Sequence, residues 1–439
     1  MGENIHRRSA DLFGRASRVL PGGVSRNTLL RATPLLYARQ GSGCQVVDVD
    51  GVERIDFANN MASLIHGHAH PAIVGAVTAQ LKLGTAFTMA TEAELLYAEN
   101  LCGRSPNFDK VRFVNSGTEA VMTALKAARA FTGRAKIAKI EGAYHGTYDY
   151  AEASQSPTPD AWGRSDNPNS VPLAKGTPEG VLADVVIIPF NDPDTAVAIL
   201  DQHRKDIAGV LLDLMPHRVG LIPASDVFVS TLRDWTRDND ALLIVDEVIT
   251  FREEVGGMQA RFTARPDLTA MAKIIGGGFP VGAVAGRDEV MSVFARTEHG
   301  IRLPHSGTFS ANPVTMTAGR VAMELYDQTA VERLNQLGDL ARRRISEAIA
   351  LSGASASVTG SGSLFRIHMQ ATPPVDYRSA YQDRDTVKRL NRFIDGVYDG
   401  GIMMLNTAAG ALSTAMGPPE IDRLAEVVED SLRESAGHH

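Results

Sequence analysis

The chain has 439 residues, of which 44% are hydrophobic and 22% charged, and its formal net charge is -7 at pH 7. This profile is typical of a globular protein, and the acidity argues against a nucleic-acid partner or an anionic membrane surface. Two cysteines exclude a disulfide framework, and no apolar run is long enough for a membrane-spanning helix or a secretory signal. We therefore expect a cytoplasmic protein with one large and one smaller domain.

The N-terminal part of the chain combines a helix with a hairpin. Helical spacing over "HRRSADLFGRASRVL" is expected to stop at the "PGG" of residues 21–23. The stretch "CQVVDVDGVERIDFAN" then predicts two strands joined at Asp50-Gly51, a dipeptide typical of tight hairpin turns. We assign residues 1–60 to an N-terminal segment that joins the smaller domain.

Helical stretches alternate with short apolar strands in the middle of the chain, which we assign to a large domain over residues 61–310. Strand candidates such as "GVLLDLM" and "LLIVDEV" are continuous apolar runs, as expected for strands covered on both faces. The alternation predicts an α/β domain with a mainly parallel sheet between helices. A Ser-, Pro-, Asn- and Gly-rich stretch after residue 153 is expected to be irregular. Long helices and then short strands predict a smaller α+β domain over residues 311–439.

Two adjacent carboxylates, Asp246 and Glu247, end one of the buried strands. Burying an ionised carboxylate is costly unless a cation or strong donors meet it. Ligands of open α/β sheets bind beyond the carboxyl ends of the strands. The sequence therefore predicts that a positively charged group meets at least one of these carboxylates at that edge of the sheet.

A second strand ends in "VNSGTEAV", where a helix is expected to begin. Ser116, Gly117 and Thr118 would present backbone N–H groups and hydroxyls at the helix N-terminus, which suits a phosphate. The same residues also match a capping box, in which Ser116 and Glu119 only stabilise the helix end. The local pattern leaves both interpretations open.

Lys273 stands in "AMAKIIGGGFPVGAVAG", directly after an apolar segment and before three glycines. This places it on a constrained turn, although a surface lysine with a buried stem is the alternative. A dinucleotide loop is excluded because the glycines lack the required spacing. A buried lysine can form a Schiff base with an aldehyde, and a buried aspartate can hold a pyridine nitrogen protonated. Lys273, Asp246 and a phosphate site together predict pyridoxal 5'-phosphate (PLP) as the cofactor.

The motifs "NSGTEA", "GAYHG", "DEV", "AKIIGGG" and "HSGTFSANP" occur in this order over most of the chain. This set resembles the class III aminotransferases of fold type I, in the branch of glutamate-1-semialdehyde aminomutase and the β-amino-acid aminotransferases. The resemblance implies a large domain with a mainly parallel seven-stranded sheet between helices, and a smaller α+β domain. It also implies a homodimer with shared active sites.

The resemblance assigns roles to individual residues. Lys273 is expected to carry the cofactor and then to act as the base of the proton shift, and Asp246 to bond the ring nitrogen. Glu247 is as well explained by a structural role as by a catalytic one. The other residues expected to bind the cofactor are Val248 behind the ring, Tyr144 stacked on its outer face with His145 adjacent, Ser116, Gly117 and Thr118 at the phosphate, and Thr308 reaching the phosphate of the partner subunit.

Substrate recognition is expected to involve Arg26 of "PGGVSRNTLL", because β-amino-acid aminotransferases bind a carboxylate with an arginine in this loop; a surface arginine is the alternative. The chain departs from the aminomutase pattern in "SRNT" and in "LPHSGT". It also has Asp213, His217 and Arg218 where the branch usually has a Glu-Pro pair and small residues. We expect His217 and Arg218 to shape the pocket, with structural pairing as the alternative.

The sequence thus predicts a PLP-dependent aminotransferase that moves an amino group from an amino acid, with β-amino acids among the candidates, to a 2-oxo acid by a ping-pong mechanism. An aminomutase or a racemase on the same scaffold is the first alternative, and a PLP-binding protein without turnover is the second. Small-molecule donors and acceptors are the expected partners, without nucleic acid, membrane or metal.

Overall fold

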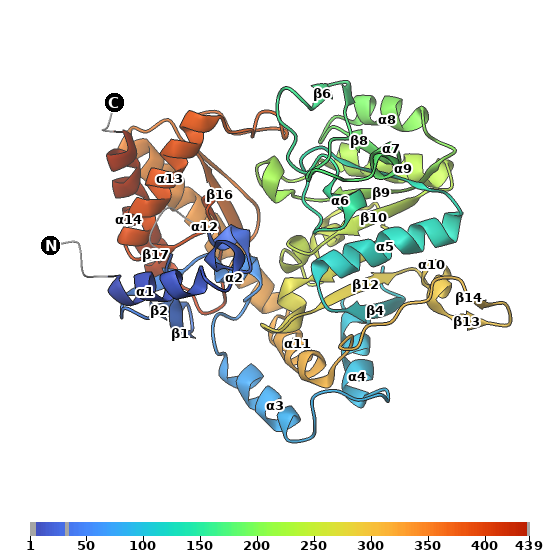
Figure 1. Ribbon diagram of the computed structural model, residues 1–439, viewed down its shortest axis with the longest axis horizontal. Coiled ribbons are helices and arrows are strands. Elements are labelled where there is room, and N and C mark those ends of the chain that lie inside the picture. The colour runs from blue at the N-terminus through green and yellow to red at the C-terminus, as the bar shows by residue number, and fades with distance from the viewer. Residues whose placement is uncertain (1–5, 31–34, 437–439) are drawn as a thin grey trace. The chain divides into compact units, whose positions relative to one another are not determined.

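The computed structural model describes residues 6–30 and 35–436, and the chain forms two compact units (Figure 1). The larger unit comprises Ala72–Arg333 and Pro374–Tyr381, and the smaller one comprises Met1–Pro71, Leu334–Pro373 and Gln382–His439. The domain boundaries expected at residues 60/61 and 310/311 stay a prediction. Pro374–Tyr381 belongs to the larger unit although the chain on either side of it belongs to the smaller one.

Seven strands form the central sheet of the larger unit, as expected for this fold. Their order across the sheet is β4-β12-β11-β10-β9-β5-β8. All neighbours are parallel except at β12, which runs antiparallel to both β11 and β4. The strands are β4 (Lys110–Val114), β5 (Lys136–Ile140), β8 (Val185–Ile188), β9 (Ile207–Asp213), β10 (Leu242–Asp246), β11 (Leu268–Ala272) and β12 (Gly282–Gly286).

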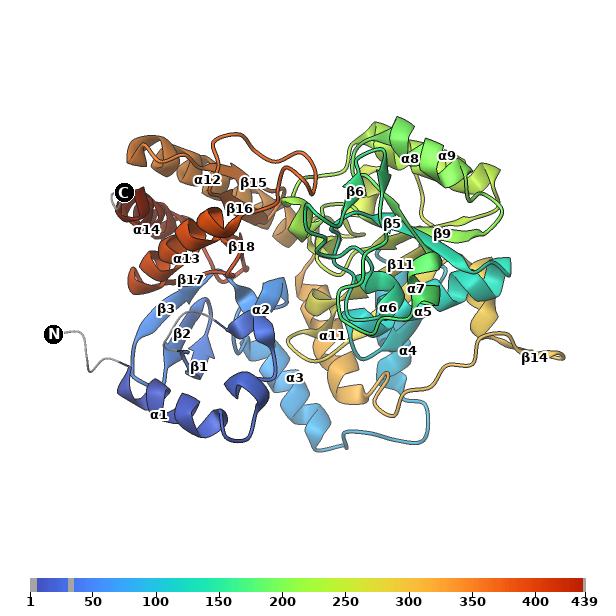
Figure 2. The ribbon, with the colours of Figure 1, turned by 45° about the horizontal axis from the view of Figure 1, so that its top comes forward.

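Both faces of this sheet are covered. Every residue of β10 is buried, and successive side chains of a strand point to opposite faces. Leu242 and Ile244 pack in one cluster with residues of α5, which lies along the sheet in Figures 1 and 2. The helices of this part of the chain are α3 (Pro71–Leu81), α4 (Glu92–Cys102), α5 (Gly117–Thr132), α6 (Asp149–Glu152), α7 (Glu179–Ala183), α8 (Pro193–Asp201), α9 (Asp226–Asp238), α10 (Asp288–Met291) and α11 (Pro313–Leu325).

Short two-residue strands form two hairpins outside the main sheet. β6 (Gly163–Arg164) pairs with β7 (Asn167–Pro168), and β13 (Arg296–Thr297) pairs with β14 (Gly300–Ile301). The β6–β7 hairpin lies in the stretch after residue 153 that the sequence predicts to be irregular, and the rest of that stretch up to α7 has no other strand or helix. This stretch is part of the larger unit.

The smaller unit contains the predicted hairpin, in which β2 and β3 pair antiparallel. The turn is held by Asp48, whose Oδ1 accepts from the backbone N–H groups of Asp50 and Val52. The two sheets of the smaller unit have the strand orders β1-β2-β3-β17 and β15-β16-β18. The strands are β1 (Ala38–Ser42), β2 (Gln45–Asp48), β3 (Glu53–Asp56), β15 (Ser357–Thr359), β16 (Leu364–His368), β17 (Ile402–Met403) and β18 (Ala409–Ala411).

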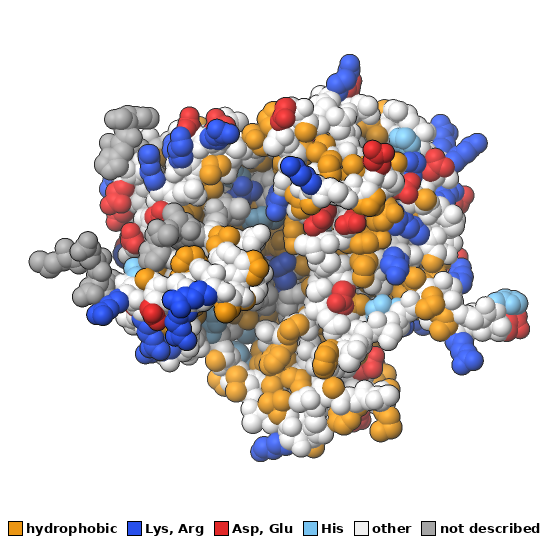
Figure 3. Space-filling model, viewed as in Figure 1, with side chains coloured by type: hydrophobic (Ala, Val, Ile, Leu, Met, Phe, Trp, Pro, Cys, Tyr) orange, Lys and Arg blue, Asp and Glu red, His pale blue; other side chains and the backbone are white. Residues whose placement is uncertain are grey.

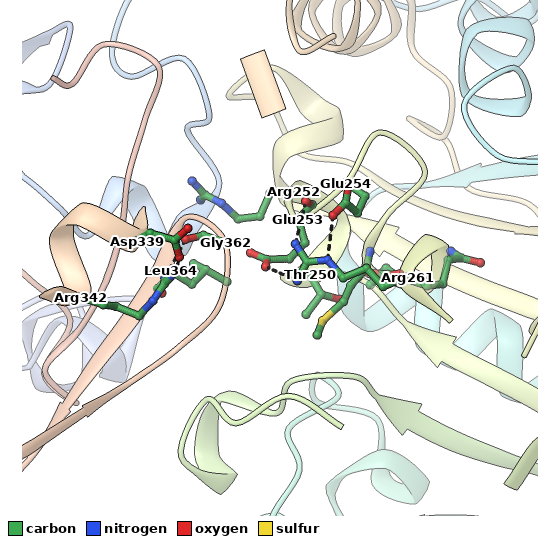
Figure 4. Close-up of polar contacts among 12 residues, drawn as sticks. Thr250, Arg252, Glu253, Glu254, Arg261, Asp339, Arg342, Gly362 and Leu364 are labelled. Carbon is green, nitrogen blue, oxygen red and sulfur yellow. Dashed lines mark hydrogen bonds and ion pairs between the residues drawn. The ribbon is translucent and has the colours of Figure 1, made fainter. Parts of the chain in front are cut away.

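The helices of the smaller unit are α1 (Arg7–Ala16), α2 (Asn59–Ala62), α13 (Arg384–Asp399), α14 (Pro418–Ala436) and the part of α12 (Gln328–Ser352) from residue 334 on. Arg342 of α12 donates to the carbonyls of Gly362 and Leu364, at 2.7 and 2.8 Å, and so joins the helix to the loop before β16 (Figure 4). α1 ends at Ala16, earlier than the expected stop at residue 21, and hydrogen-bonded turns, including the Leu20 N–H to the Ala16 carbonyl at 2.8 Å, continue the chain to Leu20.

Candidate active site

Asp246 is the last residue of β10 and lies buried at the carboxyl edge of the sheet. Its Oδ2 lies 2.7 Å from Nδ1 of His145, and its Oδ1 accepts from the backbone N–H of Val248 at 2.9 Å. Burial lowers the pKa of His145, although Asp246 opposes that shift. A neutral His145 therefore donates its Nδ1–H to the Asp246 carboxylate. The motif "GAYHG" thus supplies a partner for this buried charge.

Asp213 ends the neighbouring strand β9 and pairs in register with Asp246. The Asp213 pKa is raised well above its ordinary value, first by burial and then by the charge of Asp246. Its Oδ1 accepts from the Met215 N–H at 2.9 Å. Two adjacent buried carboxylates do not both ionise readily. Burial and the charge of Asp246 therefore both disfavour ionisation of Asp213.

Lys273 follows β11 at the start of a 3-10 turn, η6 (Lys273–Gly276), and is partly exposed. Its φ of 53° is in the left-handed region, which non-glycine residues rarely adopt and which is frequent at functional sites. Withdrawal from water lowers the pKa of its amine, while Asp246 and Asp213 act in the opposite direction. Both carboxylates thus act electrostatically on the amine, and β11 neighbours β10 in the sheet.

The N-terminus of α5 shows the capping box that the sequence left as an alternative. The Ser116 hydroxyl accepts from the Glu119 N–H at 3.1 Å, and the Glu119 carboxylate accepts from the Asn115 N–H at 2.8 Å. The first N–H groups of a helix have no partner within the helix. The groups that remain for an anion are therefore the backbone N–H groups of this first turn and the hydroxyl of Thr118.

Gly117 brings the parts of the site together. A Cβ at Gly117 would lie 3.1 Å from Cγ1 of Val248 and 3.4 Å from Cβ of Ala272, the residue before Lys273. The first turn of α5, the segment after Asp246 and the end of β11 are therefore in mutual contact. Only a residue without a side chain permits this close approach.

The "GAYHG" segment is docked on the first turn of α5. Gly146 has φ of 88°, and a Cβ there would lie 2.5 Å from Oγ1 of Thr118. The same Oγ1 accepts from the Thr147 N–H at 3.2 Å. The ring of Tyr144 remains 40% exposed. This loop therefore places His145 against Asp246 and leaves Tyr144 accessible.

The structure supports the structural interpretation of Glu247. Its carboxylate is buried and accepts from the backbone N–H groups of Met258 and Gln259, at 3.1 and 2.7 Å, and from the Thr250 hydroxyl. Burial raises its pKa to about 7. Figure 4 shows Arg261 beside the glutamates of the same loop, with its Nε 2.8 Å from Glu254. Glu247 holds residues 250–261 in place.

Two further predicted residues are Thr308 and Arg26. Thr308 is exposed. Its neighbour Gly307 lies close to Asn115 of the same chain, because a Cβ at Gly307 would be 3.3 Å from Nδ2 of Asn115. The contribution of Thr308 to a partner subunit stays a prediction. Arg26 belongs to the smaller unit, where its Nη1 donates to Oδ1 of Asn60 at 2.9 Å.

Sequence reasoning missed the segment Pro374–Tyr381. Nε and Nη2 of Arg378 each donate a hydrogen bond to the Glu141 carboxylate at 2.9 Å. Tyr377 packs against Gly142, where a Cβ would lie 1.9 Å from Cδ2 of the tyrosine. This segment therefore holds the start of the "GAYHG" loop. The unbroken run "DYRSAY" within a polar stretch carries no local signal for such a contact.

These residues fit PLP. Asp246 is a buried carboxylate at the carboxyl edge of the sheet, and Lys273 is an amine with a lowered pKa. Nε2 of His145 is buried without a hydrogen-bond partner, which leaves an unmatched polar atom beside Asp246. The N-terminus of α5 contacts the segments that carry Asp246 and Lys273. A Schiff-base amine, a carboxylate for a pyridine nitrogen and an anion site therefore lie within one region of the larger unit.

Residues 30–417 match the family model for class-III aminotransferases. The chain belongs to this family. It is 38% identical over 398 residues to a glutamate-1-semialdehyde 2,1-aminomutase from Methanothermobacter thermautotrophicus, covering 90% of this chain and 91% of the relative. Among solved structures, an omega-transaminase from Sphaerobacter thermophilus superposes with a TM-score of 0.96 at 47% identity, covering 99% of this chain and 100% of the other.

Two further solved structures are similar. A transaminase with PLP bound has a TM-score of 0.91 at 42% identity and covers 98% of each chain. A β-phenylalanine aminotransferase from Variovorax paradoxus has a TM-score of 0.86 at 31% identity, covering 97% of this chain and 94% of the other. Family and neighbours confirm fold type I and PLP as the cofactor. Within the described residues, no helix is long and apolar enough to cross a membrane.

Proposed function

We propose that this enzyme is a PLP-dependent aminotransferase that moves an amino group from an amino acid, β-amino acids included, to a 2-oxo acid. The observation that carries the proposal is the agreement with the omega-transaminase, which extends over nearly the whole chain. The similarity to the β-phenylalanine aminotransferase supports β-amino acids as donors. The segments "SRNT" and "LPHSGT", which depart from the aminomutase pattern, also support an aminotransferase.

The residues of the site suit this chemistry. Bound PLP supplies an aldehyde that condenses with amines and a ring that takes up electrons when a proton leaves carbon. Withdrawal from water lowers the pKa of the Lys273 amine, which favours the neutral form that would accept that proton and return it to the neighbouring carbon. The Asp246 carboxylate would hold the ring nitrogen protonated, and His145 would orient that carboxylate. Tyr144 and Val248 would enclose the ring between them.

The phosphate would be held by Ser116, Gly117 and Thr118 through the backbone N–H groups at the start of α5, and by Thr308 of a second copy. This sharing requires a homodimer. Apolar side chains gather over α3 and α4 on the face shown in Figure 3. Between and on these helices Leu83 is 74%, Met89 79% and Leu95 58% exposed. Such a patch is typical of an interface between subunits.

The aminomutase is the second candidate, because the curated relative at 38% identity carries that name. Initial rates with donor and acceptor both varied separate the two. An aminotransferase needs both substrates and gives parallel double-reciprocal lines, because its first product leaves before the acceptor binds. Steady isomerisation of glutamate 1-semialdehyde without any acceptor, combined with no transfer to 2-oxoglutarate or pyruvate, would overturn the proposal.

A further inference from the structure

Arg218 is a partly buried arginine without a carboxylate partner among the residues that the structure describes. It lies in a 3-10 turn, η3 (His217–Val219), that follows β9. The turn ends at Gly220, whose φ is 108°, and a Cβ there would lie 2.7 Å from Cγ of Pro374. Close packing therefore fixes the turn, and Arg218 has a defined place beside the site.

The contacts of Arg218 leave most of its hydrogen-bonding capacity unused. One Nη1–H donates to the Ser156 hydroxyl, and the Cζ atom lies 5.3 Å from the ring centroid of Tyr144. A guanidinium carries N–H donors in a planar fork that matches a carboxylate. Arg378 of the same unit differs from Arg218, because it already has a carboxylate partner. Glu141 accepts hydrogen bonds from two of the Arg378 N–H donors, each at 2.9 Å.

Arg218 lies close enough to Lys139 to act on it electrostatically. Lys139 is fully buried, and burial together with the charge of Arg218 lowers its pKa to about 7. Glu141, which also acts electrostatically on Lys139, is already paired with Arg378. Burial also lowers the pKa of Arg218, which shows that its charge is poorly solvated. A partly desolvated cation without a counter-ion favours the binding of an anion.

We propose that Arg218 binds a carboxylate of the substrate, so that carboxylated donors and oxo-acid acceptors are preferred over simple amines and aldehydes. Its guanidinium lies against Tyr144, the residue next to His145, which in turn bonds Asp246. A carboxylate held there would lie beside Tyr144, whose neighbour in the chain, His145, bonds Asp246. This inference rests on the proposed function, because it assigns the substrate class of the same site.

Binding calorimetry with the PLP-loaded enzyme tests this role without turnover. Propanoate, succinate and 3-phenylpropanoate are titrated beside their amides, into wild type, Arg218→Gln and Arg218→Lys. We expect Arg218→Gln to weaken binding of the carboxylates roughly tenfold to a hundredfold, because a charge-assisted bond is lost, and to leave binding of the amides unchanged. Arg218→Lys keeps the charge without the fork and should restore part of the affinity.

Three controls separate recognition from folding. Arg237→Gln removes an exposed arginine of α9 and should change no affinity. The thermal midpoint and the cofactor absorbance of Arg218→Gln should match wild type, since a structural role would shift both. Ser156→Ala keeps the fork and should lower carboxylate affinity only slightly.

Equal weakening of carboxylates and amides, or a wild type that binds no carboxylate better than its amide, would overturn the assignment. Carboxylate binding that depends on Arg218 in an enzyme that transfers no amino group would support the assignment and overturn the proposed function. Active transamination, combined with no effect of Arg218→Gln on the binding of any carboxylate, would overturn the assignment of Arg218 and support the proposed function.

Discussion

At the level of single residues, the site contains two aspartates in equivalent sheet positions with different hydrogen-bond partners. Asp213 and Asp246 end adjacent parallel strands and pair in register. His145 and a backbone N–H stabilise the charge of Asp246, whereas Asp213 has only the Met215 N–H and a raised pKa. The difference arises from the partners of each carboxylate and not from its strand.

This difference leads to a paired test. We expect Asp246→Asn to fold, because an amide oxygen can still accept from Val248 and His145, but to lose about a hundredfold or more in kcat, because an amide cannot keep a ring nitrogen protonated. Asp213→Asn is the matched control and should stay within about tenfold of wild type, since burial and the Asp246 charge already disfavour the ionised form that the amide removes. Steady-state kinetics with equal cofactor loading measures both. Similar losses in the two variants would contradict the assignment.

Lys139 provides a pH-dependent test. Its folded pKa of about 7 lies below its ordinary value of 10.5, so the unfolded chain binds an additional proton between these values. The contribution of Lys139 to stability therefore rises as pH increases from 7 to about 10 and is at its lowest below 7. Lys139→Met removes this titration. The difference in unfolding free energy between wild type and variant should change by about 1.4 kcal/mol per pH unit in that window. A difference in unfolding free energy that does not change with pH in denaturant titrations would exclude a buried neutral lysine.

At the level of elements, one short segment positions the loop of the site. Pro374–Tyr381 contacts the "GAYHG" loop through Arg378 on Glu141 and through Tyr377 on Gly142, whose φ is 76°. Tyr377 also donates from its hydroxyl to the Pro157 carbonyl at 2.9 Å. Tyr144 and His145 follow directly in the chain. Their position therefore depends on residues more than two hundred positions away.

Breaking this contact should loosen the loop. Arg378→Gln leaves the buried Glu141 carboxylate without its cation, which we expect to cost about 3–5 kcal/mol of stability and to speed the loss of PLP on dialysis. The double variant Glu141→Gln/Arg378→Gln should lose less than the sum of the single variants, because neither charge is then left unpaired. Chemical unfolding and cofactor absorbance measure the two effects. Additive losses would show that the pair does not couple the segment to the loop.

At the level of the whole molecule, the proposed shared sites depend on a dimer, and the apolar surface of α3 and α4 is the candidate interface. We expect Leu83→Lys/Met89→Lys to raise the dimer dissociation constant by roughly a hundredfold or more, because two charges would be buried on association. Val227→Lys is the control, since this residue is 64% exposed on α9, outside that surface. Light scattering after gel filtration gives the masses. A monomeric wild type, or a variant that stays dimeric at all concentrations, would contradict the interface.

The central sheet followed from the sequence to a large extent, because continuous apolar strands and the helices between them are local patterns. The strand β11 was visible only as the short apolar segment before Lys273, and the antiparallel direction of β12 had no signature, since strand direction depends on the path of the chain between strands. The predicted first helix is longer than α1, because residues 17–20 form hydrogen-bonded turns and not a regular helix.

The sequence by itself determined the family and the cofactor, because five motifs in order carry Lys273, Asp246 and the start of α5, and each depends on residues adjacent in the chain. Only the tertiary structure decided which partners these groups have. His145 and Asp246 are 101 positions apart, and Arg378 and Glu141 are 237 apart. The raised pKa of Asp213, the structural role of Glu247 and the contacts of Arg218 depend on burial and on neighbouring groups. These are properties of the folded chain, since pKa values respond to distances in space and not to positions in the sequence.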